Sequence, residues 1–483
     1  MFLCTSAAIC EAFRLTSLSS LANSDLWWHL RTGLWILQNH ALPHDGLFSQ
    51  SSELPWIASS WGYDVLVAVA YRILGLRAIP VLLMLCRTAL AVTTFLLARG
   101  NRGNFWSAVL LSAIAQYVLA DRQPLPLFFS ILAFGIALIV LVQARRSGQV
   151  RQLFWLPALF LVWANVHTGF VYGLLLLGLF LASTTIEQWG RHSGVMWFTN
   201  GALALPITTT AAVTGLSILA TLLTPYGYRN YAVAFAAFGG PADKYFADLH
   251  SMGFRRPQDY VLMLLTMAAF LALGRRRSHD IFSIFLLMSS TALSFHTQRD
   301  SWLATLVSIA VIAGAISGDE PSDETARTQY RRTYRWSRTG LVTNALVLFV
   351  LVMAAWIRIP ASREALLRTI GKSYPVAAAD YIRENHLPQP LFNNYDWGGF
   401  LAWYLPEYPA SIDGRTDLYG GDAFLRYFKV MNAELPPTEE PALAHARTLV
   451  LPRHSLMGEA FSTLPPFQVA YQDDVAVVLL KQE

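Results

Sequence analysis

The sequence contains few charged residues and little cysteine. Only 14% of its 483 residues are charged and 54% are hydrophobic, whereas a typical soluble protein has about 25% charged residues. This balance excludes a single soluble globule. The three cysteines, Cys4, Cys10 and Cys86, lie in apolar stretches, so the sequence predicts neither a disulfide framework nor a metal–thiolate site. The formal net charge of +5 does not indicate a nucleic-acid partner, because the arginines lie in short loops between apolar blocks.

Apolar blocks fill most of residues 1–358, and many approach the roughly 17–25 residues of a membrane-spanning helix. The pattern predicts a polytopic α-helical membrane domain with about eleven spans. The apolar N-terminus shows no convincing small-residue cleavage site, so it is predicted to be retained as the first span. The predicted spans are residues 1–22, 76–98, 105–120, 125–143, 153–165, 169–186, 196–223, 260–274, 281–295, 302–317 and 341–357.

Arginine clusters in alternate connections give the predicted orientation. An excess of Lys and Arg marks the cytoplasmic side of a membrane protein. The opposite side then holds two outer loops, residues 24–61 and 225–258, and everything after residue 358. The clusters are Arg99 and Arg102, then Arg145, Arg146 and Arg151, then Arg275, Arg276 and Arg277, and finally Arg327, Arg331, Arg332, Arg335 and Arg338.

Residues 359–483 differ from the membrane domain, because their prolines and charges are typical of soluble protein. Short apolar segments at 448–451 and 475–480 predict strands, and residues 377–385 predict a helix. The sequence therefore predicts a small extracytoplasmic α/β domain, packed on the outer face of the membrane domain.

The first outer loop, residues 24–61, combines carboxylates, imidazoles and indoles beside the bilayer. A simple connection between two helices needs none of these groups. Indole rings form aromatic belts at membrane interfaces, and their flat faces also suit sugar rings. The loop is therefore predicted to bring a polar substrate to a membrane-held one. Its members are Asp25, His29, Arg31, His40, His44, Asp45 and Glu53, with Trp27, Trp28, Trp35, Trp56 and Trp61.

Asp25 is the first candidate for catalysis. It follows the first predicted span at the interface, where partial burial can tune the pKa of a carboxylate for a general base. The alternative is that Asp25 or Ser24 caps the helix that follows. His29 comes one turn later on the same helix face, as an assisting imidazole or merely an interfacial one. Asp45 is a third candidate, although Asp-Gly is also ordinary turn chemistry.

Short outer turns supply candidate phosphate ligands. Arginine suits phosphate because its planar fork donates two hydrogen bonds at once. The long loop 225–258 adds further groups and has the length of a loop that closes over substrate. Each cation alone is also explained as an anchor at a helix end. Together they predict a phosphate site, provided that their turns converge on Asp25. The candidates are Arg122, His167, His296 and Arg299 in the short turns, and Tyr226 and Arg229 in the long loop.

Two motifs resemble the C-type superfamily of integral-membrane glycosyltransferases (GT-C). The first is residues 25–33, Asp-Leu-Trp-Trp-His-Leu-Arg-Thr-Gly, followed by Leu42, Pro43 and Asp45. It is similar to uncharacterised bacterial members, which carry a further Asp two positions before Asp25, where this chain has Asn23. The resemblance therefore implies a single base and assigns no metal ligand, and leaves a role for a divalent cation open.

The second motif covers residues 394–400 and 412–419. It is similar to the outer domain of the same bacterial proteins and, distantly, to the Trp-Trp-Asp-Tyr-Gly region of the oligosaccharyltransferase catalytic subunit, which binds acceptor peptide. This chain has a single tryptophan there in a different order, so peptide recognition is not carried over. The acceptor-side candidates are Asp396, Trp397, Asp413, Arg415 and Asp417.

The resemblance implies a glycosyltransferase of the bacterial inner membrane. Its expected donor is a polyprenyl-phosphate sugar, its acceptor a glycan, lipid or protein, and its reaction a single displacement in which Asp25 deprotonates the acceptor. The alternatives are a lipid-linked sugar transporter or flippase, a polysaccharide polymerase or ligase, and a scaffold that binds a cell-wall partner. A transporter would have ionisable groups near the bilayer midplane on interrupted helices, whereas the polar groups here gather in outer loops.

Overall fold

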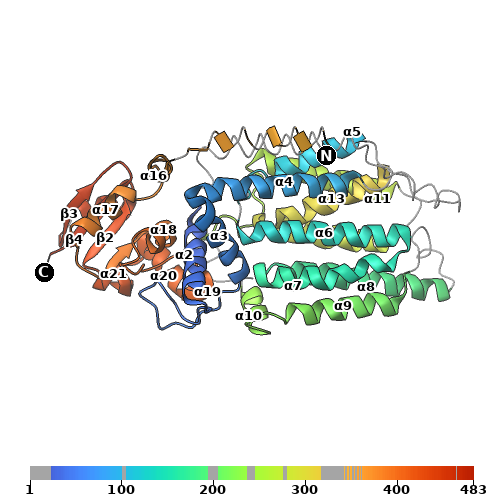
Figure 1. Ribbon diagram of the computed structural model, residues 1–483, viewed down its shortest axis with the longest axis horizontal. Coiled ribbons are helices and arrows are strands. Elements are labelled where there is room, and N and C mark those ends of the chain that lie inside the picture. Colours follow the sequence, from blue (N-terminus) through green and yellow to red (C-terminus); the bar gives the residue numbers. More distant parts are fainter. Residues whose placement is uncertain are drawn as a thin grey trace.

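The computed structural model describes residues 23–99, 105–123, 125–193, 205–236, 245–275, 280–316, 359–360, 362–463 and 465–482, with scattered residues between 342 and 357. The predicted span 1–22 lies outside the described residues, as do most of the span 341–357 and the start of the span 196–223. Among the orientation arginines, Arg102, Arg276, Arg277 and the 327–338 group also lie outside them. The described part consists of a long helical bundle with a small α/β domain at one end (Figure 1).

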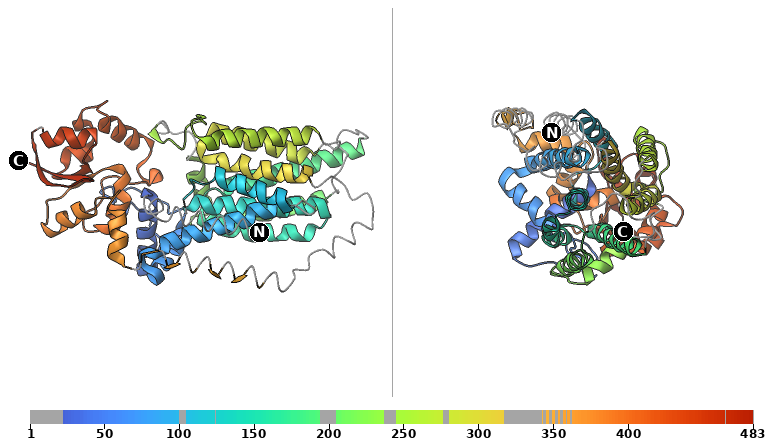
Figure 2. Two further views of the ribbon diagram at one scale, coloured as in Figure 1. Left: turned by 90° about the horizontal axis from the view of Figure 1, so that it is seen from above. Right: turned by 90° about the vertical axis from the view of Figure 1, so that its right-hand side faces the viewer.

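Apolar helices run side by side along the bundle, and the short helix α10 lies at its end (Figures 1 and 2). Short 3-10 segments connect some of them, namely η1 (Gly75–Arg77), η2 (Val150–Trp155) and η5 (Gln298–Asp300). The helices are α4 (Ala78–Arg99), α5 (Phe105–Val118), α6 (Pro126–Ser147), α7 (Leu156–Val166), α8 (Phe170–His192), α9 (Ile207–Thr221), α10 (Arg229–Ala236), α11 (Pro257–Gly274), α12 (Ile281–His296) and α13 (Ser301–Ile316).

Five helical stretches of the described chain are long and apolar enough to cross a membrane. Four shorter apolar helices, α5, α9, α12 and the η2–α7 stretch Val150–Val166, accompany them. Large apolar side chains such as Leu110, Val162 and Leu264 are exposed on the bundle surface, as a lipid-facing surface requires. The protein is therefore a helical membrane protein, and the count of eleven spans stays a prediction. The five stretches are Trp61–Arg99, Pro126–Ser147, Phe170–Gly190, Pro257–Gly274 and Gln298–Ile316.

Helices α2 (Ser24–Asn39) and α3 (Trp61–Leu74) lie across the end of the bundle, between it and the C-terminal domain (Figure 1). They cross closely, because a Cβ atom on Gly33 of α2 would lie 1.9 Å from the backbone oxygen of Asp64 in α3. A side chain at Gly33 would force the helices apart. The first outer loop therefore begins and ends in one tightly packed helix pair.

The C-terminal domain contains a four-stranded sheet of order β1-β2-β4-β3. Strand β1 (Leu391–Asn393) pairs parallel with β2 (Thr448–Pro452), and β4 (Ala476–Lys481) pairs antiparallel with β2 and β3 (Phe467–Gln472). Both predicted strands and the predicted helix correspond to elements, namely β2, β4 and α17. The domain's helices are α16 (Arg363–Ile370), α17 (Val376–Glu384), α18 (Tyr395–Tyr404), α19 (Thr416–Tyr419), α20 (Gly421–Met431), α21 (Pro441–His445) and α22 (Leu456–Thr463), with the 3-10 segment η6 (Pro437–Glu439). The predicted domain boundary at 358/359 stays a prediction.

Helix α18 packs directly on α2. A Cβ atom on Gly399 would lie 2.6 Å from the backbone oxygen of Ser24, closer than side chains tolerate. Trp27 of α2 is fully buried and inserts into the aromatic side of α18, stacking on Trp403 at 4.7 Å and meeting Phe400 edge-on at 5.5 Å. The second sequence motif thus holds the C-terminal domain against the membrane domain.

Substituting Gly399 with alanine should weaken this docking. The added Cβ would overpack the contact with α2, which typically costs about 1–3 kcal/mol of unfolding free energy. Thermal unfolding in detergent would measure the loss. Gly178→Ala in α8, where a Cβ would meet nothing within 4 Å, should be neutral or slightly stabilising because alanine favours helix. Equal melting temperatures for Gly399→Ala and the wild type would contradict the close contact.

Candidate functional site

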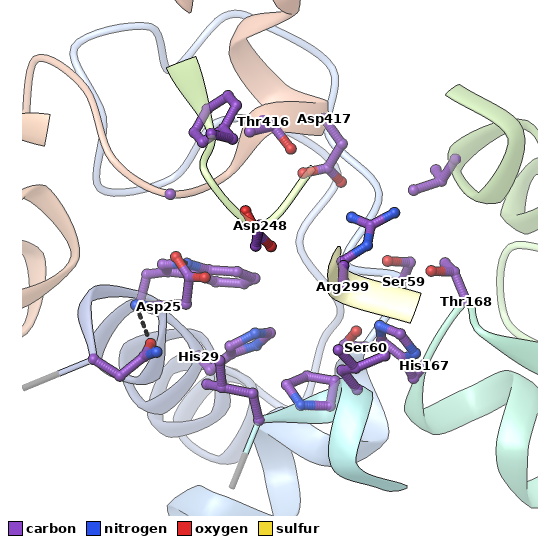
Figure 3. Close-up of a pocket in the computed structure, with 18 of the residues that line it drawn as sticks. Asp25, His29, Ser59, Ser60, His167, Thr168, Asp248, Arg299, Thr416 and Asp417 are labelled. Carbon is purple, nitrogen blue, oxygen red and sulfur yellow. Dashed lines mark hydrogen bonds between the residues drawn. The ribbon is translucent and has the colours of Figure 1, made fainter. Parts of the chain in front are cut away.

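A cavity of about 810 Å³ lies where the bundle, α2 and the C-terminal domain meet. In Figure 3, Asp25 and His29 stand on one side of it, and Arg299 and His167 on the other. Its wall combines polar and aromatic groups with apolar side chains from the start of α6. The polar and aromatic lining residues include Asn23, Asp25, Trp28, His29, Trp56, Ser59, Ser60, Asp64, Asp121, Arg122, His167, Thr168, Asp248, Arg299, Tyr395, Thr416 and Asp417.

Four predicted site residues, far apart in the sequence, line this one cavity. Asp25 comes from α2, Arg122 from the turn before α6, His167 from the turn between α7 and α8, and Arg299 from η5. The outer turns therefore do converge on the first loop. The phosphate-site hypothesis required this convergence.

The carboxylate of Asp25 is not used as a helix cap. The side chain of Asn23 caps α2 by accepting from the backbone N–H of Asp25, at 2.9 Å. Trp28 Nε1 donates to Asp25 Oδ1 at 3.3 Å. Burial raises the pKa of Asp25 to about 6, against the opposing effect of the nearby His29. Asn23 therefore caps the helix, and Asp25 does not. With this pKa, Asp25 can exchange protons near neutral pH.

The backbone of the C-terminal domain covers this carboxylate. A Cβ atom on Gly414 would lie 2.0 Å from Asp25 Oδ1 and 2.9 Å from Trp28 Nε1. The Gly414 backbone can therefore lie against Asp25 only because it carries no side chain. This close cover contributes to the burial that shifts the pKa.

His29 lines the cavity one turn after Asp25. Its ring stacks on Trp28 at 3.5 Å between centroids, and its Nδ1 lies 2.5 Å from Oδ1 of Asp64. Burial lowers the pKa of His29 to about 3, although Asp25 opposes this. The imidazole is therefore neutral at physiological pH, and its Nδ1 edge is already occupied.

Arg122 joins two of the outer turns. Its guanidinium donates to the backbone oxygen of Gln298 and to Ser301 Oγ, each at 2.7 Å. Arg87 of α4 donates to the backbone oxygens of Leu119 at 2.6 Å and of Ala120, and so supports the turn that carries Arg122. Arg122 thus contributes charge at the cavity wall while its hydrogen bonds hold the wall together.

Arg299 projects into the cavity from η5 (Figure 3). Its backbone N–H donates to the backbone oxygen of Asp248 at 2.7 Å, so η5 and the long outer loop are fixed to each other. His167, beside it, accepts at Nδ1 from the backbone N–H of Gly169 at 3.0 Å and from Ser130 Oγ at 2.7 Å. Burial, assisted by the charge of Arg299, lowers the pKa of His167 to about 3. The side of the cavity opposite Asp25 therefore combines the arginine Arg299 with the neutral imidazole of His167.

Several cavity residues were absent from the sequence-based candidates. Asp248 lies between Asp25 and Asp417 in Figure 3, and its charge adds to the rise of the Asp25 pKa. The only sequence signal for it is a carboxylate in a long outer loop. Ser59, Ser60, Thr168 and Thr416 also line the cavity, and Thr168 and Thr416 directly adjoin predicted residues.

Other predicted residues lie away from the cavity. Asp45 is exposed in a turn whose backbone pairs with Pro55, and His296 and Arg229 are exposed. The hydroxyl of Tyr226 donates to the backbone oxygen of Pro43 at 3.2 Å. The catalytic candidate Asp45 and these three phosphate candidates therefore lie outside the lining of this cavity.

The acceptor-side candidates divide in the same way. Asp396 is exposed, outside the cavity lining, and the buried indole of Trp397 donates to the backbone oxygen of Ser373 at 3.0 Å. Only Asp417 lines the cavity, where its Oδ2 accepts from Trp56 Nε1 at 3.1 Å.

Asp413 and Arg415 form a buried ion pair that holds the first outer loop. Arg415 Nη2 lies 2.7 Å from Asp413 Oδ2, and both side chains are at most 1% exposed. The guanidinium also donates to the backbone oxygen of Leu47 at 2.8 Å and lies 4.8 Å from the ring centre of Trp56. The predicted acceptor pair therefore positions the loop that carries Trp56.

In the part of the chain that the structure describes, no group of three or more His, Cys, Asp or Glu side chains is placed to hold a metal ion. The carboxylates at the cavity are spread along its wall instead. The structure therefore assigns no metal ligands.

Comparison with known proteins places the chain by its fold. No protein-family model and no curated protein matches the sequence. The oligosaccharyltransferase AglB from Archaeoglobus fulgidus, in complex with an inhibitory peptide and a dolichol-phosphate, aligns with a TM-score of 0.53 and 10% identity over 93% of this chain and 69% of its own. The apo form of the Archaeoglobus fulgidus oligosaccharyltransferase gives a TM-score of 0.54 at 11% identity, over 94% of this chain and 69% of its own.

ArnT from Cupriavidus metallidurans, bound to undecaprenyl phosphate, aligns over 99% of this chain and 97% of its own, with a TM-score of 0.48 and 12% identity. These neighbours are GT-C glycosyltransferases. At such low identity the likeness to the archaeal oligosaccharyltransferase shows the fold alone. The chain shares the fold of the archaeal oligosaccharyltransferase, which agrees with the resemblance of its two motifs to GT-C proteins.

Replacing Arg415 with methionine should destabilise the domain interface strongly. Removing one partner of a buried ion pair leaves an uncompensated charge, here Asp413, at a cost of about 3–5 kcal/mol. The variant should melt earlier in detergent, and chymotrypsin should cleave faster after Phe48 in the released loop. Arg453→Met is the matched control, because its partner Asp474 is fully exposed and such pairs contribute about 0–1 kcal/mol. Similar behaviour of the two variants would contradict the positioning role of Arg415.

Proposed function

We propose that the protein is a membrane glycosyltransferase that moves a sugar from a polyprenyl-phosphate donor to an extracytoplasmic acceptor. The observation that carries the proposal is the single cavity that joins Asp25, with its raised pKa, to Arg299 and His167. The GT-C fold supports it, since the structure of AglB with the same fold is a complex with dolichol-phosphate and a peptide.

The proposed reaction is one displacement. Asp25 takes the proton of the acceptor hydroxyl or amine as that group attacks the anomeric carbon. The bond between the anomeric carbon and the phosphate oxygen breaks, and the lipid phosphate leaves with the bonding electrons. Arg299 stabilises the charge that develops on this phosphate, which is the kind of preorganised electrostatics that lowers barriers most. Trp28, which is only partly buried at the cavity wall, offers a flat face for the sugar.

The cavity is also suited to a donor that arrives from the bilayer. Leu125, Leu127 and Ile131, at the start of α6, form an apolar part of its wall. The cations Arg122 and Arg299 lie in the turns at that same end of the bundle. A prenyl chain along the bundle would thus place its phosphate beside the arginines and its sugar toward Asp25.

The proposal includes the predicted topology of about eleven spans in the bacterial inner membrane, with α2, the outer loops and the C-terminal domain outside the cytoplasm. The described parts agree with this arrangement, because α2, the cavity and the C-terminal domain all lie at one end of the bundle (Figures 1 and 2). A cavity at the end of the spans, away from their midpoints, favours surface chemistry over transport through the bundle.

Transfer should depend on deprotonated Asp25. Because burial raises the pKa of this carboxyl to about 6, kcat/KM should fall about tenfold per pH unit below that value and level off above it. Asp25→Asn should abolish the transfer of radiolabelled sugar from polyprenyl phosphate. Asp422→Asn, which changes an exposed carboxylate in the first turn of α20, should leave the rate and its pH profile unchanged. Full activity of Asp25→Asn would reject the base.

Arg299→Ala should slow transfer by about 10²–10³-fold, the usual effect of removing one group that stabilises transition-state charge. The loss should appear mainly in kcat at saturating donor, since the charge on the phosphate grows as the bond breaks. Arg255→Ala, at an exposed arginine of the long outer loop outside the cavity lining, serves as the control. If both arginine variants keep wild-type kcat, Arg299 does not contact the leaving group.

A further inference from the structure

The contact between His29 and Asp64 is set by helix packing. His29 Nδ1 and Asp64 Oδ1 are 2.5 Å apart, and their side chains are 5% and 1% exposed. The two residues belong to α2 and α3, whose backbones touch at Gly33. The distance is therefore held by two rigid elements, which is how positioned active-site groups are usually supported.

The surroundings of Asp64 indicate how many protons the pair holds. Asp64 Oδ2 is buried and has no hydrogen-bond partner among the described residues. An ionised carboxylate needs hydrogen bonds to both oxygens, and an unpaired charge in an apolar interior costs several kcal/mol. A pair that holds two protons in all is neutral, whereas a carboxylate facing a neutral imidazole carries a buried net charge. The neutral pair is favoured.

A neutral pair fixes the chemistry of the opposite ring edge. Either the carboxyl donates its proton to Nδ1 of a neutral imidazole, or Nδ1 donates to a carboxylate as part of an imidazolium. In both arrangements Nε2 carries a hydrogen. Burial lowers the pKa of His29 to about 3, which favours the first arrangement. His29 therefore presents an N–H group and no lone pair.

The neighbouring rings hold the His29 imidazole in place, with its Nε2 edge available to the cavity. Trp28 stacks on one face at 3.5 Å, and Tyr63 meets the ring edge-on at 5.0 Å. Figure 3 shows the imidazole pointing into the cavity, with Asp25 above it and His167 across from it. A group with several strong acceptor oxygens, such as a phosphate, is the natural partner for a fixed donor that faces Arg299 across the cavity.

We propose that Asp64 is a positioning residue that fixes His29 as a hydrogen-bond donor to the phosphate of the lipid-linked donor. This proposal rests on the proposed function, because it takes the phosphate ligand from it. The two groups on α2 then have separate roles. Asp25 takes the proton from the acceptor substrate, and His29 gives a hydrogen bond to the phosphate of the lipid-linked sugar.

The proposal is tested with the full-length protein in lipid nanodiscs. Nitrogen-15 NMR of labelled histidine, assigned with His29→Gln, reports whether Nε2 is protonated between pH 6 and 8. Binding of polyprenyl phosphate is then measured for the wild type and for substitutions of His29 and Asp64. His454→Ala, at an exposed histidine of the C-terminal domain, is the control.

We expect Nε2 to be protonated throughout that range and His29→Ala to weaken phosphate binding about tenfold or more, as for a lost hydrogen bond to a charged group. His29→Gln should bind more tightly than His29→Ala, because its amide also donates. Asp64→Ala should weaken binding, whereas Asp64→Asn should stay within about threefold of the wild type, since its amide can donate to Nδ1.

An unprotonated Nε2, or a loss with Asp64→Asn as severe as with Asp64→Ala, would overturn the proposal. Such a loss with asparagine is typical of a histidine that acts as a base and is held in the wrong tautomer. Unchanged binding by His29→Ala in a protein that does bind the phosphate would also overturn it. Failure of the wild type itself to bind polyprenyl phosphate would instead reject the proposed function, and the phosphate contact with it.

Discussion

The site depends on the packing of α2 against glycines of the C-terminal domain. Gly399 lies against the start of α2, and Gly414 lies against the carboxylate of Asp25, each at a distance that leaves no room for a side chain. The Gly399 contact is with the backbone of Ser24 and is stiff, because neither side can relax by changing a rotamer. The same helix then carries His29 to Asp64 of α3. One interface therefore fixes the proposed base Asp25, the proposed hydrogen-bond donor His29 and the residue that orients His29, Asp64.

Burial at this interface gives the polar groups their chemical character. Removing water from Asp25 raises its pKa to about 6, and removing water from His29 and His167 lowers theirs to about 3. The first shift makes a carboxylate able to accept a proton near neutral pH, and the second keeps both imidazoles uncharged there. The fixed positive charge then comes from arginine, which keeps its charge when buried. A proton-accepting side and a phosphate-binding side can thus coexist within one cavity of about 810 Å³.

The sequence predicted those cavity residues whose height relative to the bilayer is set by the ends of the spans. Asp25, Arg122, His167 and Arg299 lie next to apolar blocks, so their height relative to the bilayer could be inferred from the ends of those blocks, and all four line the cavity. The ends of the apolar blocks do not determine which way a side chain points within a turn. For this reason the sequence predicts Asp45 and His296 as site residues, although both are exposed. Asp64 could not be predicted as a partner of His29, because a carboxylate in the first turn of a helix is ordinary and the contact arises only from the crossing of α2 and α3.

The two sequence motifs, separated by some 370 residues, form one structural unit. Residues 412–419 supply Gly414 over Asp25, the buried pair Asp413–Arg415 that holds the loop of Trp56, and Asp417 at the cavity wall. If the C-terminal domain were only a platform for the acceptor, its conspicuous residues would face solvent, and Asp413 and Arg415 would not be buried. Their burial indicates that the domain completes the cavity. In the proposed reaction, acceptor selection then belongs to the groups that the domain contributes to the cavity wall, among them Asp417, Thr416 and Tyr395.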